Sequence, residues 1–145
     1  MTEDIQTVPE QTEEKTEEQA RAEMYKYLKE SFGDNAPTEE TVANWKARHR
    51  RVRLLPLSDE EVYFVRPIKR NEYKALLKSA QAGGGEDVET FLRESIVSKC
   101  VLWPMMDTAQ FSDSLGGTVD AVYQVIMDAS NFVSQEALFT VVREL

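Results

Sequence analysis

The clearest hydrophobic pattern in the chain lies over residues 52–67. Residues 62–65 are Val, Tyr, Phe and Val in an unbroken run, and side chains of this kind favour a pleated, half-buried surface. A second apolar run covers 52–57, and the polar residues 58–61 between the two runs suit a hairpin turn. Pro67 disfavours helix at the residue before it. The pattern therefore predicts an antiparallel β-hairpin at about 52–67.

Helical periodicity surrounds this hairpin, with apolar residues recurring every three or four positions. Gly33 suits the end of a first helix, because glycine readily adopts left-handed backbone geometry. Thr38, followed by two glutamates, suits the start of a second helix that ends in the sequence KARHRRVR. The segment 105–115 is expected to form a loop or a short helix. The first helix is expected at about 18–32, and further helices are expected at about 69–81, 86–100, 118–131 and 134–145.

The strongest helical pattern begins after Gly117, where Thr118 suits an N-cap and Asn131 can end the helix. A last helix is expected to begin at Ser134. Its apolar residues are expected to continue the core: Ala137, Leu138, Val141, Val142 and Leu145. The two helices carry apolar side chains on more than one face, so an interface with another chain stays open as the alternative. The residues assigned to that interface are Tyr123, Met127, Phe132, Phe139 and Val142.

Two short segments separate the helices in the second half of the chain. The glycines at 83–85 predict a flexible linker, since they lack the lysine and the hydroxyl residue of a phosphate-binding loop. The sequence CVLWP at 100–104 is expected to lie in the interior as a hinge between two helices, because Pro104 favours extended geometry before it. Cys100 is expected to be a small buried hydrophobe rather than a nucleophile.

Composition fits one modest domain with a tail, because 41% of the 145 residues are hydrophobic. Residues 1–17 are acidic and poor in apolar side chains, which predicts a disordered tail. Residues 18–37 are expected to form an N-terminal helix and connector, and 38–145 a single domain. The predicted fold class is α+β, mainly α-helical with one small antiparallel β-hairpin, preceded by a disordered acidic N-terminal tail.

The net charge of -9 disfavours nonspecific binding to nucleic acid or to anionic membranes. A basic segment nevertheless follows the second helix and contains Arg48, Arg50, Arg51 and Arg53. These cations can complement the dipole at a helix C-terminus or lie on the solvent face of a strand. The functional alternatives are phosphate binding and attraction of the acidic tail or of an acidic protein partner. The four arginines are therefore candidate partner-binding residues.

The sequence offers little material for catalysis. The only histidine, His49, lies among arginines that favour its neutral form, and no carboxylate partner is marked by its spacing. A single cysteine excludes an internal disulfide and a multi-cysteine zinc site, and suits a reducing compartment. We therefore expect no enzymatic activity, cofactor, metal or small-molecule substrate. We also expect no export signal, and the sequence contains no apolar run of about 20 residues that could span a membrane.

Several motifs occur in an order that resembles small proteins from the tail-morphogenesis modules of tailed bacteriophages, above all tail assembly chaperones and small baseplate proteins. The motifs are the run VYFVRPIKRNEYKALLK, the V-L-W-P element at 101–104 and a helix over 116–132 that begins at glycine and ends in DASNF. The likeness covers about 37–133. In the first motif it is carried by Val62, Phe64, Arg66, Pro67, Arg70, Glu72 and Tyr73.

The resemblance implies a noncatalytic role in the host cytoplasm, in which such chaperones coat the tape-measure protein and recruit tail-tube subunits. The expected partners are phage tail proteins (tape measure, tail tube or baseplate) or a second copy of the chain, with no membrane. The acidic N-terminal tail departs from the family pattern, which leaves a virion-resident tail or baseplate component as an alternative. An acidic inhibitor that mimics nucleic acid is a further alternative, although the densest acidic run lies in the predicted tail rather than on a folded face.

Overall fold

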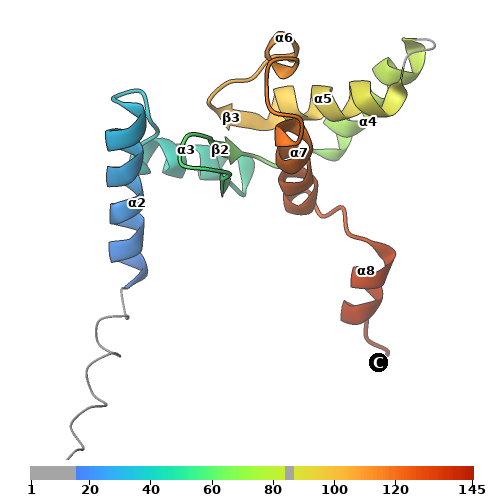
Figure 1. The fold of residues 1–145 in the computed structure, drawn as a ribbon. Helices are drawn as coiled ribbons and strands as arrows, with labels where there is room; N and C mark the ends of the chain where they lie inside the picture. The colour runs from blue at the N-terminus through green and yellow to red at the C-terminus, as the bar shows by residue number, and fades with distance from the viewer. Residues whose placement is uncertain (1–15, 84–86) are drawn as a thin grey trace, which may run out of the picture. The chain divides into compact units, whose positions relative to one another are not determined.

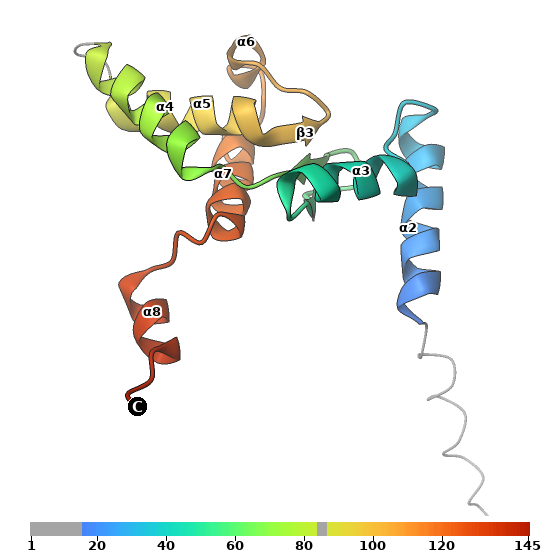
Figure 2. The same ribbon diagram turned by 180° about the vertical axis from the view of Figure 1, so that it is seen from behind.

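The computed structural model describes residues 16–83 and 87–145, and Figures 1 and 2 show its ribbon from opposite sides. The chain divides into two compact units, Met1–Ala43 and Asn44–Leu145. The architecture is mainly helical with a small antiparallel sheet, which confirms the predicted fold class. The expectation of a disordered tail at 1–17 falls largely outside the described residues. Glycines 84 and 85 of the expected linker fall wholly outside them.

The first unit contains the long helix α2, which spans Glu17–Phe32. The Thr16 hydroxyl accepts a hydrogen bond from the backbone N–H of Gln19, and the Gln19 side chain accepts one from the N–H of Thr16. This reciprocal arrangement satisfies two amides that the helix itself leaves unpaired. Gly33 follows the helix with a φ of 88°, so the predicted end of this helix is confirmed.

Helix α3 spans Glu39–His49, and the predicted cap at Thr38 is confirmed, because its hydroxyl accepts a hydrogen bond from the N–H of Thr41 at 3.2 Å. Arg50 follows α3 with a φ of 73°, in the left-handed region. Its N–H donates to the carbonyl of Lys46 at 2.9 Å. This is the αL end of a helix, a position that usually holds glycine.

The second unit contains a three-stranded antiparallel sheet in the order β1-β2-β3, formed by Arg53–Pro56, Val62–Val65 and Val101–Trp103. Strands β1 and β2 form the predicted hairpin, with Leu54 opposite Phe64. All four residues of the central strand β2 are buried. Burial on both faces explains why β2 is a continuous apolar run rather than an alternating one.

Strand β3 is a difference from the prediction, which placed 101–103 in a hinge. Trp103 pairs with Phe64 of β2, so the segment adds an edge strand to the hairpin. The expected burial of this region is confirmed for Cys100, which is fully buried, and for Val101, which is 6% exposed. A three-residue strand that starts directly after a helix carries no turn signal, and its partner lies almost 40 residues earlier in the chain.

Five further helices complete the described part of this unit: α4 (Arg70–Ala82), α5 (Val88–Cys100), α6 (Thr108–Phe111), α7 (Thr118–Ala129) and α8 (Gln135–Val141). Helices α5 and α7 supply most of the core that packs on Tyr63 and Val65 of the sheet. The core residues of these two helices are Ile96, Val97, Cys100, Val122, Ile126 and Met127.

Phe64 of β2 contacts two aromatic rings. The Phe64 ring lies 5.7 Å from Trp45 of α3 and 6.4 Å from Trp103 of β3, measured between ring centroids. Tilted and edge-to-face arrangements such as these are the favoured geometries for aromatic pairs. The aromatic residues at 45, 64 and 103 thus join α3, the hairpin and β3.

Two expectations about the C-terminal helices are corrected. Thr118 is the first residue of α7 rather than its N-cap, a position that Gly117 occupies, and the buried Thr118 hydroxyl is instead hydrogen-bonded to the Glu61 carboxylate at 3.2 Å. Helix α8 begins after Ser134 as predicted, but it contributes no buried residue. The expectation that Ala137, Leu138, Val141, Val142 and Leu145 continue the core is therefore wrong.

Candidate functional site

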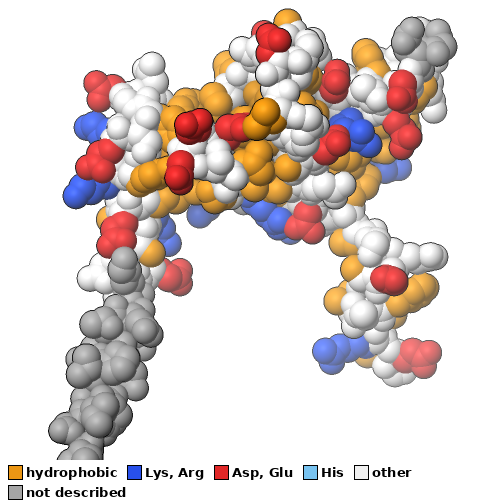
Figure 3. Space-filling model, in the orientation of Figure 1, with side chains coloured by type: hydrophobic (Ala, Val, Ile, Leu, Met, Phe, Trp, Pro, Cys, Tyr) orange, Lys and Arg blue, Asp and Glu red, His pale blue; other side chains and the backbone are white. Residues whose placement is uncertain are grey.

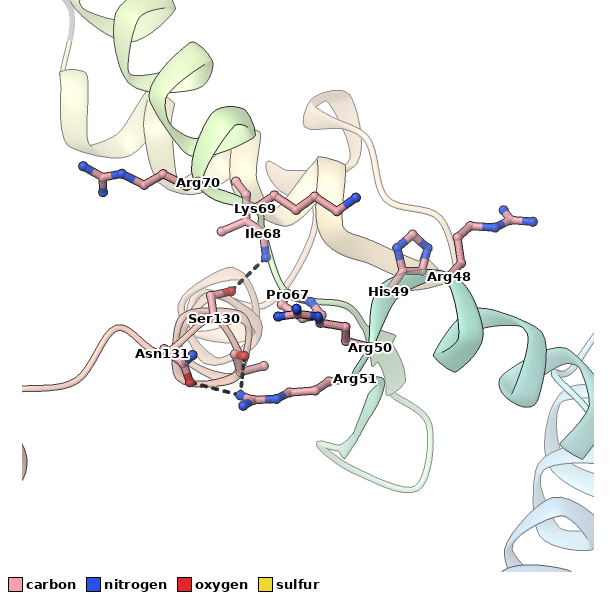
Figure 4. A pocket seen from close by; sticks show the side chains of 11 residues that line it. Arg48, His49, Arg50, Arg51, Pro67, Ile68, Lys69, Arg70, Ser130 and Asn131 are labelled. Carbon is pink, nitrogen blue, oxygen red and sulfur yellow. Dashed lines mark hydrogen bonds between the residues drawn. The ribbon is translucent and has the colours of Figure 1, made fainter. Parts of the chain in front are cut away.

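A pocket of about 560 Å³ opens where the ends of α3 and α7 meet the start of α4. Its walls come from three segments that are far apart in the sequence, residues 48–51, 67–70 and 129–131 (Figure 4). The volume falls in the range of about 300–1,000 Å³ that is common for ligand sites. We call this hollow the basic pocket.

Hydrogen bonds from the end of α7 fix two walls of the basic pocket. The Ser130 hydroxyl accepts a hydrogen bond from the N–H of Ile68 at 2.8 Å and donates to the Ile126 carbonyl at 2.6 Å. Arg51 donates to the carbonyl of Ala129 at 2.8 Å and to the side-chain oxygen of Asn131 at 3.1 Å (Figure 4). These contacts hold the three segments together without using the other cations.

Asn131 gives the end of α7 its shape. It has a φ of 69°, and the N–H of Phe132 donates to the Met127 carbonyl while the N–H of Asn131 donates to the Asp128 carbonyl. This pair of hydrogen bonds is the Schellman motif, in which asparagine can replace glycine. The predicted helix end at Asn131 is therefore correct to within two residues, and its side chain also receives Arg51.

The charge of the basic pocket is one-sided. Its lining contains Arg48, Arg50, Arg51, Lys69 and Arg70, and no acidic residue. Figure 4 shows the Arg50 side chain extending from the end of α3 toward Pro67 and the Lys69 side chain extending from the start of α4 toward His49, whereas Arg48 and Arg70 point outward at the two ends of the hollow. Arg51 is thus the only one of the five with a hydrogen bond or ion pair from its side chain in the described part of the chain.

His49 lies at the rim of the same pocket. Partial burial, followed by the charges of Arg66, Arg48 and Lys69, lowers the pKa of its imidazole. The direction agrees with the expectation that cationic neighbours favour the neutral form. A neutral imidazole can donate one hydrogen bond and accept another, which suits a polar wall of a binding site.

Arg53, the fourth predicted arginine, lies outside the pocket lining and forms an ion pair with Asp128 of α7. Tyr123 is half-buried beneath the guanidinium of Arg93, whose central carbon lies 5.2 Å from the ring centroid. Met127 is only 8% exposed and belongs to the core, so its side chain is not available to a partner. These three predicted partner residues therefore have structural contacts within the chain.

The remaining predicted partner residues lie in 131–145, which we call the C-terminal arm. Every residue of the arm is exposed. Phe139 is 68% exposed and Val142 57%, while Phe132, at 39%, packs its ring 5.0 Å from that of Tyr73. Figure 3 shows apolar side chains on the surface of this last helix. The arm thus presents apolar area that no other described residue covers.

Arg66 and Glu72, two residues of the motif that carries the phage resemblance, have a structural role. Arg66 is 8% exposed and donates to both carboxylate oxygens of Glu72, to the carbonyl of Pro67 and to that of Lys99. The pair ties the end of β2 to the first turn of α4. Because these donors are used within the fold, Arg66 adds little to the binding capacity of the pocket beside it.

The described residues contain no group of three or more histidine, cysteine or carboxylate side chains that could hold a metal ion. Burial raises the pKa of the Cys100 thiol to about 11, which leaves it protonated at neutral pH. None of the helices in the ranges 16–83 and 87–145 is long and apolar enough to cross a bilayer.

Sequence reasoning found Arg48, Arg50 and Arg51 but not the pocket that they help to form. Lys69, Arg70 and Ser130 are separated from them by about 20 to 80 positions and reach the site only through the fold. The positive φ of Arg50 had no sequence signal, since arginine is an ordinary helix residue. Comparison of the chain with protein-family models, with curated proteins and with solved structures finds no match.

Proposed function

We propose that the chain is a noncatalytic phage tail morphogenesis protein, a tail assembly chaperone that binds a tape-measure or tail-tube protein through its C-terminal arm. The order of the strand, V-L-W-P and glycine-initiated helix motifs supports the phage assignment. The exposed apolar arm carries the assignment of a binding role. A chaperone needs such a surface, because it must cover apolar regions of a partner before assembly.

The length of α8 supports this role. The helix has seven residues and no buried side chain, whereas isolated helices shorter than about 12–15 residues are marginal in water. Burial of its apolar side chains by a partner would supply the stability that the core does not. Each fully buried Leu, Val or Phe contributes about 1.5–3 kcal/mol.

The spacing of the apolar residues suits docking into a groove. Leu138, Val141, Val142 and Leu145 fall at positions i, i+3, i+4 and i+7, and Phe139, three residues before Val142, lies at the edge of this stripe. This is the pattern by which an amphipathic helix presents one face to a hydrophobic groove. Val142 adopts extended geometry at the end of α8, so full use of the stripe requires one further turn of helix on binding.

The test is co-expression of the chain with tape-measure, tail-tube and baseplate proteins, followed by affinity capture and measurement of mass by light scattering. We expect capture of a tape-measure or tail-tube protein, and we expect Phe139→Asp and Val142→Asp to weaken it at least tenfold, the equivalent of about 1.4 kcal/mol. Glu136→Gln, on the same helix, is the matched control and should leave capture unchanged. A chain that stays monomeric and captures no tail protein overturns the proposal.

Capture of a baseplate protein alone would favour the alternative of a structural tail component. A defined homo-oligomer that is lost in Phe139→Asp would show that the arm binds a second copy of the chain instead.

A further inference from the structure

We propose that the basic pocket is a second binding site, which takes an acidic peptide segment of a protein partner and holds its carboxylates between Arg50 and Lys69. This inference goes beyond the function proposed for the C-terminal arm and does not depend on what the arm binds. The features that support it are the cations that have no hydrogen-bond or ion-pair partner among the described residues, the backbone geometry of Arg50, the fixed walls and the shape of the pocket.

The positive charge of the pocket is not balanced by an acidic residue in its lining. Arg50 and Lys69 come from different segments and line the same hollow, where the Arg50 side chain extends toward Pro67 and the Lys69 side chain toward His49 (Figure 4). Two acidic residues lie nearby, but each already forms an ion pair with another arginine, Glu72 with Arg66 and Asp128 with Arg53. Arg50 and Lys69 therefore have donors available for a ligand, and charge-assisted hydrogen bonds are about twice as strong as neutral ones.

The backbone at Arg50 has left-handed geometry. Its φ of 73° lies in a region that is sterically unfavourable for a residue other than glycine. Glycine or asparagine would end α3 more favourably, as Asn131 does at the end of α7. Strained positions of this kind cluster at ligand sites, where the side chain serves a purpose that offsets the cost. The residue placed there at this cost is a cation that lines the pocket.

Hydrogen bonds fix the walls of the pocket. The Ser130 hydroxyl accepts the N–H of Ile68, and Arg51 donates to the carbonyl of Ala129 at the end of α7, so the site is already assembled without a ligand. A preformed site avoids the entropy cost of ordering loops on binding.

The shape of the pocket selects an acidic peptide over a nucleic acid. Its cations are gathered in one hollow, whereas nucleic acid is bound by a stripe of cations that follows successive phosphates. Pro67 and Ile68 add an apolar wall on which the methylene groups of a glutamate can pack. The neutral imidazole of His49 can donate a hydrogen bond to a carboxylate without adding a further charge.

The test uses fluorescence anisotropy of a labelled hexaglutamate peptide with the full chain, in buffer of fixed ionic strength. We expect Arg50→Gly and Lys69→Gln each to weaken binding about tenfold. Arg50→Lys keeps the charge and should retain most of the affinity. Lys78→Gln removes the same charge from the exposed outer part of α4 and should leave affinity within twofold.

Arg50→Gly separates binding from folding, because glycine accepts the positive φ at this position. Its melting temperature should equal or exceed that of the wild type. The proposal is overturned if hexaglutamate does not bind, or if it binds the wild type, Arg50→Gly and Lys69→Gln equally. It is also overturned if a single-stranded oligonucleotide or inorganic phosphate displaces the peptide at lower concentration than unlabelled hexaglutamate does. Loss of peptide binding with tail-protein capture intact would confirm that the pocket and the arm act separately.

Discussion

The guanidinium of Arg66 meets the carboxylate of Glu72 through two parallel hydrogen bonds of 3.0 and 3.2 Å, between the end of β2 and the first turn of α4. Glu72 also accepts the N–H of Lys69 at 3.0 Å. We expect Glu72→Gln to lower the free energy of unfolding by about 1–3 kcal/mol, because it leaves a buried guanidinium without its charged partner. Urea denaturation followed by circular dichroism measures this. Glu60→Gln in the hairpin turn is the control and should cost less than about 0.5 kcal/mol.

The same pair makes stability depend on pH. Burial alone would raise the pKa of Glu72, but the hydrogen bonds from Arg66 and Lys69, together with the Arg66 charge, lower it overall. A carboxyl whose pKa is lower in the folded chain stabilises the fold above its unfolded-state value of about 4.3, and this contribution is lost as the pH falls through the folded-state value. We therefore expect the wild type to lose more stability than Glu72→Gln between neutral pH and about pH 3. Equal losses in the two proteins would contradict this role.

The core and the C-terminal arm should respond differently to the same kind of change. Ile126 is fully buried in α7, and Ile126→Ala should cost about 2–5 kcal/mol of stability. Leu138 is 45% exposed in α8, and Leu138→Ala should change stability by less than about 0.5 kcal/mol. Urea denaturation of the two variants compares them directly. A large loss in Leu138→Ala would mean that α8 packs on the core in solution.

Asn131 should tolerate glycine better than alanine. Its φ of 69° suits glycine, whereas alanine in this geometry is strained. Both variants lose the hydrogen bond from Arg51, so the difference between them isolates the backbone effect. We expect Asn131→Gly to be more stable than Asn131→Ala by about 1 kcal/mol. Thermal unfolding of the pair measures this difference, and alanine as the more stable variant would rule out the left-handed conformation.

Cys100 should be unreactive in the folded protein. It is fully buried, and burial raises the pKa of its thiol to about 11. Since only the thiolate is a good nucleophile, alkylation by iodoacetamide at pH 8 should be slow until the chain is unfolded in urea. Rapid labelling of the native protein, followed by mass spectrometry, would be inconsistent with this environment.

Local patterns predicted most of the fold. The β-branched and aromatic run at 62–65 identified the hairpin, and Thr38 and Ser134 marked the starts of α3 and α8, because caps and strand composition act over a few residues. Strand β3 was missed for the opposite reason. Its three residues form a strand only because β2 offers an unpaired edge, and that edge is created by the tertiary structure.

Burial was harder to predict than helix formation. Met127 and Val142 both lie on apolar helical stripes, yet one is in the core and the other is exposed. Periodicity shows which side of a helix is apolar, but it does not say whether a partner for that side exists in the same chain. The basic pocket could not be predicted from the sequence for a related reason, because its charged residues come from segments that only the fold brings together.

The rings around Phe64 give the protein a built-in optical probe. The chain has two tryptophans, Trp45 and Trp103, and both lie against this one phenylalanine of the central strand. Tryptophan emission, excited at a wavelength that tyrosine does not absorb, therefore reports the environment of α3 and the sheet edge, and α8 contains no tryptophan. Loss of the sheet will alter the emission spectrum, while a partner that covers only the C-terminal arm will leave it unchanged. Unfolding and arm occupancy can thus be followed separately in one unlabelled sample, the first by emission and the second by light scattering.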